Sequence, residues 1–214
     1  MDIASKIDHT LLKSDATEKE IVNLCHEAVK YGFAAVCLNP TYVCTAARLL
    51  HGTNVAVATV VAFPLGASLT ETKVQEILAA KAHGAREVDA VINISRLKSG
   101  DWKTVERDLE QMVRTAHGCG LKIKIIIETG LLNLEEKKRA AAMVKASGAD
   151  YIKTSTGFFG GATVEDVKLL KELVGPEVKV KASGGIRTKE FALELLEAGA
   201  DRLGTSSGLA LMEG

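Results

Sequence analysis

The stretch Ala146-Ser-Gly148-Ala-Asp-Tyr-Ile-Lys153 joins the end of an alanine-rich helix to a short apolar strand. A glycine directly after a helix accommodates the left-handed backbone conformation that ends it. The same order of helix, glycine and strand recurs along the chain about every 30 residues, as expected of repeated βα units. The glycines that mark these boundaries are Gly32, Gly52, Gly84, Gly120, Gly148, Gly175 and Gly199.

Each glycine precedes a run rich in valine and isoleucine, and several of these runs are continuously apolar. Continuous apolar runs are typical of strands in a parallel sheet that helices cover. An eighth run precedes the first helix, and no linker divides the chain. We therefore predict an α/β protein with one (β/α)8 TIM barrel domain over residues 1–214. The predicted strands are Ile7–Leu11, Phe33–Leu38, Val55–Phe63, Glu87–Ile94, Lys122–Thr129, Tyr151–Thr154, Val178–Ala182 and Arg202–Thr205.

An open doubly wound sheet is the alternative fold. That fold usually carries a glycine-rich fingerprint after its first strand. Here the first predicted helix follows Lys13-Ser-Asp-Ala-Thr17, and the sequence contains no G-x-G-x-x-G. The barrel is therefore favoured. Four helix starts carry a cap residue that is followed three positions later by an acidic residue, at Thr17, Ser68, Asn133 and Thr163.

The overall charge excludes some classes of partner. Lys plus Arg and Asp plus Glu both number 27, so there is no basic excess to attract nucleic acid or an anionic membrane, and neither is expected as a partner. The N-terminal stretch Met1–Asp8 lacks the apolar core of a signal peptide, and no apolar run reaches transmembrane length. We expect a cytoplasmic protein.

Two lysines lie at the ends of predicted strands, where barrels place their chemistry. Lys153 and Lys181 fall on consecutive strands, which lie about 4.8 Å apart. Burial and a second ammonium both lower the pKa of a lysine, and a neutral lysine attacks carbonyls to form a Schiff base. Moving the pKa from about 10.4 to near 7 requires about 4–5 kcal/mol. The alternative is that both strand ends are exposed and both lysines are solvated.

Asp89 lies in the apolar run Glu87-Val-Asp-Ala-Val-Ile-Asn93. A carboxylate buried there needs a partner, and a lysine is the obvious candidate. Asp89 is either a general acid/base beside a Schiff base or one half of a structural ion pair.

Two glycine turns follow the last two predicted strands, at Ser183–Arg187 and Gly204–Gly208. Barrels often bind phosphate between these two loops. The predicted phosphate-binding residues are Gly184, Gly185, Arg187, Gly204, Ser206 and Ser207. Further candidates for substrate binding at strand ends are Asp8, Thr10, Cys37, Thr154 and Gly157, although Cys37 also fits a buried core thiol.

These motifs resemble those of one family, deoxyribose-phosphate aldolase, over essentially the whole chain. The pairing of Lys153-Thr-Ser-Thr-Gly157 with Lys181-Ala-Ser-Gly-Gly-Ile-Arg187 is very specific for the family. The other matching segments are Ile7-Asp-His-Thr-Leu-Leu12, Val36-Cys-Leu-Asn-Pro40, Phe63-Pro-Leu-Gly66, Glu87-Val-Asp-Ala-Val-Ile-Asn93, Ile127-Glu-Thr-Gly130 and Gly204-Thr-Ser-Ser207.

The resemblance implies a role for each of three residues. Lys153 would form the Schiff base, Lys181 would keep it neutral and assist proton transfer, and Asp89 would be the acid/base carboxylate. The implied reaction, part of deoxyribonucleotide catabolism, cleaves 2-deoxy-D-ribose 5-phosphate reversibly to D-glyceraldehyde 3-phosphate and acetaldehyde. The resemblance implies no metal or organic cofactor, and a homodimer or homotetramer.

Two other functions remain open from the residues alone. A phosphosugar-binding barrel without aldol chemistry would keep Gly184, Gly185 and Ser206 but would not need both lysines. Another Schiff-base aldolase, acting on a different phosphorylated sugar, would keep a lysine but not this pair with Asp89.

Overall fold

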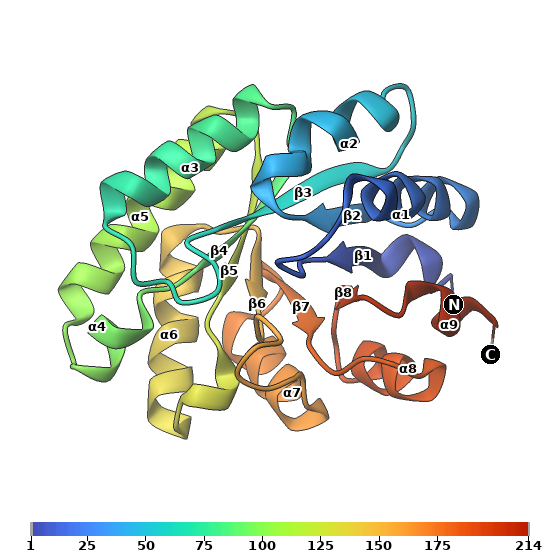
Figure 1. Cartoon of the computed structure of the whole chain (residues 1–214). Helices are drawn as coiled ribbons and strands as arrows, with labels where there is room; N and C mark the ends of the chain where they lie inside the picture. Colours follow the sequence, from blue (N-terminus) through green and yellow to red (C-terminus); the bar gives the residue numbers. More distant parts are fainter. Residues whose placement is uncertain (1, 214) are drawn as a thin grey trace.

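The computed structural model describes residues 2–213, which form a closed barrel of eight parallel strands with helices around it (Figure 1). Each strand pairs with the next one in sequence, and the last pairs with the first. The closed ring confirms the predicted barrel and excludes an open sheet. The strands are β1 (Ile7–Leu11), β2 (Ala35–Leu38), β3 (Ala56–Val61), β4 (Glu87–Val91), β5 (Lys122–Ile126), β6 (Tyr151–Lys153), β7 (Lys179–Ser183) and β8 (Arg202–Thr205).

The helices lie outside the ring and cover the strands (Figure 1). None within residues 2–213 has the length and apolar character needed to cross a membrane. Short 3-10 turns occupy Ala4–Lys6, Pro40–Tyr42 and Thr129–Leu131. The α-helices are α1 (Glu18–Tyr31), α2 (Val43–Leu49), α3 (Thr70–Ala82), α4 (Ile94–Lys98), α5 (Trp102–Gly118), α6 (Leu134–Ser147), α7 (Val164–Val174), α8 (Lys189–Glu197) and α9 (Gly208–Glu213).

Three of the four predicted helix caps are confirmed. Thr17 and Asn133 each form a capping box with the glutamate three residues later, and the Thr163 side chain accepts a hydrogen bond from a backbone N–H of α7. The cap predicted at Ser68 is wrong. The first hydrogen bond of α3 runs from the Lys73 N–H to the Leu69 carbonyl, so Leu69 takes the cap position and makes no side-chain cap bond.

The strands β3, β4, β5 and β6 end earlier than predicted, and at β3 and β4 local polar contacts withdraw the backbone from the sheet. β3 stops before Ala62, whose φ is 51° and whose N–H donates to Glu76 Oε2 at 2.6 Å. β4 stops at Val91, and Asn93 then caps α4 by accepting a hydrogen bond from the Arg96 N–H at 3.2 Å. These turns carry the chain away from the ring at its C-terminal rim.

The main apolar core lies between the strands and the helices, where outward-facing valines and isoleucines meet buried helix residues such as Ile77 and Met112. Inside the ring, a small apolar cluster consists of Ala35, Cys37, Ala58 and Val60. Much of the remaining interior is charged. Because successive strand residues face opposite sides, each strand can present apolar groups to the helices and polar groups to the interior.

A buried ion pair joins α3 to α5 within the outer layer. Lys73 Nζ lies 2.5 Å from Asp108 Oδ2, and it also donates to the Val91 carbonyl at 3.0 Å. The side chains of Lys73 and Asp108 are 0% and 1% exposed. Burial lowers the pKa of Lys73, and Asp108 opposes that shift. The pair therefore attaches both helices to the end of β4.

We expect Asp108→Ala to lower the free energy of unfolding by about 3–5 kcal/mol, because it leaves a buried ammonium without its counter-charge. The double variant Lys73→Met/Asp108→Leu replaces the pair with apolar groups and is expected to unfold close to wild type. Urea denaturation followed by circular dichroism gives both values. If Asp108→Ala unfolds at the same urea concentration as wild type, the ion pair between Lys73 and Asp108 does not hold α3 and α5 together.

Candidate active site

The three predicted catalytic side chains meet at one carboxylate oxygen inside the ring. Lys153 ends β6 and is paired in register with Lys181 on β7. Asp89 Oδ2 lies 2.7 Å from Lys153 Nζ and 2.7 Å from Lys181 Nζ. Their exposed fractions are 3%, 0% and 0% for Lys153, Lys181 and Asp89. The alternative of two solvated lysines is therefore wrong.

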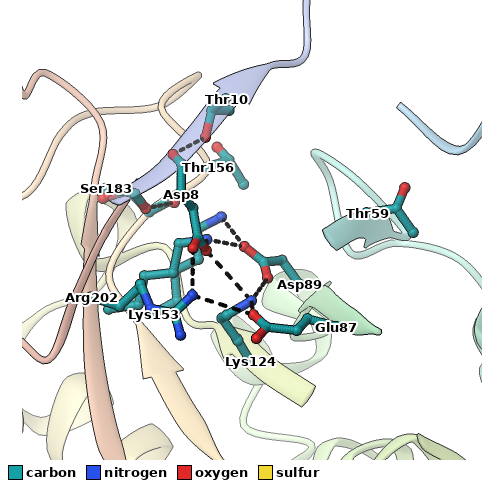
Figure 2. Close-up of polar contacts among 12 residues, drawn as sticks. Asp8, Thr10, Thr59, Glu87, Asp89, Lys124, Lys153, Thr156, Ser183 and Arg202 are labelled. Carbon is teal, nitrogen blue, oxygen red and sulfur yellow. Dashed lines mark hydrogen bonds and ion pairs between the residues drawn. The ribbon is translucent and has the colours of Figure 1, made fainter. Parts of the chain in front are cut away.

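Further charged side chains surround this contact (Figure 2). Lys124 Nζ on β5 lies 2.8 Å from Asp89 Oδ1 and 2.6 Å from Glu87 Oε2. On the opposite side, Asp8 Oδ2 lies 2.5 Å from Lys181 Nζ, and Asp8 Oδ1 lies 2.6 Å from Arg202 Nη1. We call these seven residues the charge cluster: Asp8, Glu87, Asp89, Lys124, Lys153, Lys181 and Arg202.

The charge cluster holds three carboxylates and four basic groups, so it has an excess positive charge when all seven are ionised. An uncompensated charge is costly in a buried site, and loss of one proton balances the cluster. Arginine does not lose its proton in proteins, so the proton must come from a lysine.

The surroundings lower the pKa of Lys153 but raise the pKa values of Lys124 and Lys181. Burial lowers the pKa of Lys153, Asp89 opposes that shift, and the nearby Lys181 ammonium adds to it. Burial also acts against the charged form of Lys181, but Asp8 and Asp89 hold the pKa of Lys181 above its ordinary value. Lys124 behaves in the same way, because Asp89, Asp8 and Glu87 outweigh the effect of burial on its pKa.

A cavity of about 330 Å³ lies above the charge cluster at the C-terminal ends of the strands. Of the seven cluster residues, Lys153 alone lines this cavity. A molecule in the cavity therefore meets the lysine that most readily becomes neutral, while the other charges stay beneath it. Predicted binding residues that also line the cavity are Thr10, Gly157, Gly184, Gly185, Arg187, Gly204 and Ser206.

Gly204 is required by close packing at the base of the cavity. A Cβ at this position would lie 3.0 Å from Lys181 Cε and 3.0 Å from Ser183 Cβ. The absent side chain gives Lys181 the space to reach Asp89. Above it, Gly184 and Gly185 have φ values of 89° and 76°, which glycine adopts without strain, and they bring backbone to the wall of the cavity.

Four predicted binding residues do not line the cavity. Asp8 belongs to the charge cluster. Thr154 Oγ1 accepts a hydrogen bond from the Ser183 N–H at 3.1 Å, and the Ser207 N–H donates to Thr205 Oγ1 at 2.9 Å. Cys37 is fully buried, and burial raises the pKa of its thiol to about 11, as expected of a core thiol.

The sequence reasoning gave no role to several residues that the fold brings into the site. Glu87 and Arg202 belong to the charge cluster, and Lys13 and Thr156 line the cavity. Glu87 could have been found, because it lies two residues before Asp89 and so faces the same side of the strand. Lys13 gives no such periodic signal, because it follows β1 in a loop.

The arrangement combines a buried amine of lowered pKa with a cavity lined by glycine turns and by the side chains of Lys13 and Arg187. The amine can attack a carbonyl carbon, and the turns can accept an anionic group through backbone N–H donors. The site therefore fits covalent amine chemistry on an anionic carbonyl compound.

Comparison with known proteins agrees with this chemistry. Residues 3–214 match the model of the DeoC/LacD family aldolases. A deoxyribose-phosphate aldolase of Desulfitobacterium hafniense is 68% identical over 213 residues, covering 99% of this chain and 98% of the relative. One from Thermococcus gammatolerans is 55% identical, covering 100% of this chain and 96% of the relative.

A solved structure shows the same fold. The deoxyribose phosphate aldolase of Aeropyrum pernix, described as a unique tetrameric structure, superposes with a TM-score of 0.92 at 36% identity. The match covers 99% of this chain and 89% of that one.

We expect Lys181→Met to shift the reactivity of Lys153 towards higher pH. Removing the Lys181 ammonium removes a repulsion that lowers the pKa of Lys153, so Lys153 should stay protonated to a higher pH. Reductive methylation across a pH series, read by peptide mass spectrometry, measures the midpoint for this lysine. Lys179→Met, an exposed change on the same strand, is the control. If the pH midpoint of Lys153 methylation is unchanged in Lys181→Met, Lys181 does not lower the pKa of Lys153.

Proposed function

The chain belongs to the DeoC/LacD family of aldolases, and from this premise we propose that it cleaves 2-deoxy-D-ribose 5-phosphate reversibly to D-glyceraldehyde 3-phosphate and acetaldehyde. The observation that carries the proposal is that Lys153 alone joins the charge cluster to the cavity. The relatives named deoxyribose-phosphate aldolase support the choice of substrate over other phosphorylated sugars.

The reaction begins with attack of neutral Lys153 on C1 of the open-chain sugar. Loss of water gives an imine, and the protonated imine draws electrons from the adjacent bonds. The bond between C2 and C3 then breaks, because acetaldehyde carries C1 and C2 and glyceraldehyde 3-phosphate carries the rest. The enamine left on Lys153 takes a proton at C2, and hydrolysis of the imine releases acetaldehyde.

Asp89 is the proposed acid/base carboxylate, acting on the C3 hydroxyl directly or through water. Burial acts to raise the pKa of Asp89, but Lys124, Lys153 and Lys181 hold it well below its ordinary range. The carboxylate therefore stays ionised at neutral pH and can accept a proton. Lys181 donates a hydrogen bond to Asp89 Oδ2. It is the proposed proton donor when the reaction runs in the reverse direction.

The glycine turns after β7 and β8 are the proposed phosphate site. Gly184, Gly185, Arg187 and Ser206 line the cavity that also holds Lys153. Binding the phosphate there fixes the distance between the sugar carbonyl and the amine, so that remote binding energy favours the reaction. A binding barrel without catalysis would not need the buried charges beneath Lys153.

The proposed setting is the cytoplasm, and the proposed assembly is a homodimer or homotetramer. The tetramer described for the Aeropyrum pernix relative supports self-association.

Incubation with acetaldehyde and borohydride is expected to leave a reduced two-carbon group on Lys153, detected by peptide mass spectrometry. Lys153→Leu should remove the adduct and lower retro-aldol activity on 2-deoxyribose 5-phosphate by at least about 10³-fold. Lys179→Met serves as the control variant and should keep both the adduct on Lys153 and the retro-aldol activity. An adduct that persists in Lys153→Leu, or wild-type protein without retro-aldol activity, would contradict the assignment.

Treatment with a chelator should leave the retro-aldol activity unchanged, because the protonated imine, and not a metal ion, withdraws the electrons. The assay compares enzyme dialysed against EDTA with untreated enzyme. Activity that falls and returns on adding a divalent metal would place the protein in the metal-dependent class of aldolases instead.

A further inference from the structure

Glu128 follows β5 and has an unusual conformation for a buried residue. It is 0% exposed, and its φ and ψ are 57° and 66° in the left-handed region, which is costly for a residue with a side chain. Its Oε1 has no hydrogen-bond partner among residues 2–213. Strain and an unpartnered buried oxygen persist only where the surrounding structure enforces them, and such outliers often mark functional positions.

The other carboxylate oxygen of Glu128 holds the turn that follows Lys153. Glu128 Oε2 accepts hydrogen bonds from the Thr156 N–H at 3.0 Å and from Thr156 Oγ1 at 2.5 Å. Thr156 Oγ1 in turn accepts a hydrogen bond from the Phe158 N–H at 3.1 Å. One oxygen thus orders the turn Thr156–Phe158, and all three residues of that turn line the cavity.

The same loop touches the glycine turn after β7. The Ala162 N–H donates to the Gly184 carbonyl at 3.0 Å. A Cβ at Gly184 would lie 3.2 Å from Gly157 Cα and 2.9 Å from Gly161 Cα, so the two backbones are in direct contact. A displaced Thr156–Phe158 turn would therefore move the cavity wall at Gly184, where the phosphate is proposed to bind.

We propose that Glu128 is a positioning residue that holds the Thr156–Phe158 turn against Gly184 and so gives the enzyme its preference for phosphorylated over unphosphorylated sugar. The inference rests on the proposed function for the identity of the sugar. Glu128 does not line the cavity, so it acts through Thr156 and the glycine contact rather than on the substrate. The amine chemistry at Lys153 depends on the charge cluster. Glu128 does not belong to that cluster, so its loss should leave the amine chemistry unchanged.

The test compares the kinetics of two substrates in variants of the full chain. In Glu128→Ala, the KM for 2-deoxyribose 5-phosphate should rise about tenfold, as expected when a positioning contact is lost, while kcat changes little. The kcat/KM for unphosphorylated 2-deoxyribose should stay within about twofold of wild type. A purely structural role would lower activity on both sugars together.

Matched variants separate the side chain from the strained backbone. Glu128→Gly removes the carboxylate and relieves the left-handed strain, so it should fold well and still show the raised KM. Glu128→Gln keeps an oxygen that can accept from Thr156, and it should restore the KM to near wild type. Thr156→Val removes the hydroxyl that donates to Glu128 and accepts from the Phe158 N–H. Adding it to Glu128→Ala should raise the KM by less than the product of the two separate effects, because both changes break the bond between Thr156 Oγ1 and Glu128.

Binding of inorganic phosphate, measured by titration calorimetry, tests the same role without any turnover. The Kd should rise about tenfold in Glu128→Ala and Glu128→Gly but not in Glu128→Gln, in line with the expected KM changes. If wild-type protein cleaves neither sugar, the proposed function fails, and phosphate affinity in these variants still decides the role of Glu128. Wild-type KM and phosphate affinity in Glu128→Ala and Glu128→Gly, or equal losses on both sugars, would overturn the proposal.

Discussion

The carboxylate of Asp89 accepts hydrogen bonds from three lysines on three different strands, and the interior of the barrel depends on this contact. Its oxygens lie 2.8 Å from Lys124 Nζ and 2.7 Å from both Lys153 Nζ and Lys181 Nζ. Without Asp89, three lysine side chains would be buried close together with too little negative charge between them. Because the three lysines come from β5, β6 and β7, the same contact links β4 to the next three strands of the ring.

Burying so much charge is not the most stable way to fill a barrel, since well-packed apolar groups often do as well or better than buried ion pairs. The fold tolerates the charge because its main apolar core lies elsewhere, between the strands and the helices. The interior is thereby left for chemistry. The burial and the crowding of basic groups that make the cluster costly also lower the pKa of Lys153, as the proposed nucleophile requires.

The charge cluster and the cavity occupy different depths of the site. The charge cluster lies within the ring, whereas the cavity above it is formed largely by loops and glycine turns at the C-terminal rim. Lys153 belongs to both. The rim is held by short polar contacts between neighbouring loops, among them the hydrogen bonds that Thr156 donates to Glu128, and by glycines that let backbones touch. Such contacts fix the shape of the cavity without adding charge to it.

The sequence by itself determined the order of elements, since each apolar strand run and each helix-ending glycine is a local feature. It also placed Lys153, Lys181 and Asp89 at strand positions where a barrel would gather them, and the family motifs gave them roles. It misplaced the start of α3 and the ends of β3, β4, β5 and β6. At β3 and β4 the turns are set by backbone N–H groups that donate to Glu76 and Asn93, contacts that depend on the folded chain.

Only the tertiary structure decided which charged side chains lie in contact inside the ring. Asp8, Glu87 and Arg202 are far from Lys153 along the chain, and their effect on a pKa depends on distances and burial that ring closure creates. The structure also separated residues that line the cavity from those beneath it, and it revealed the strained Glu128. A sequence pattern records which residues are polar, but solvation and charge interactions act through space.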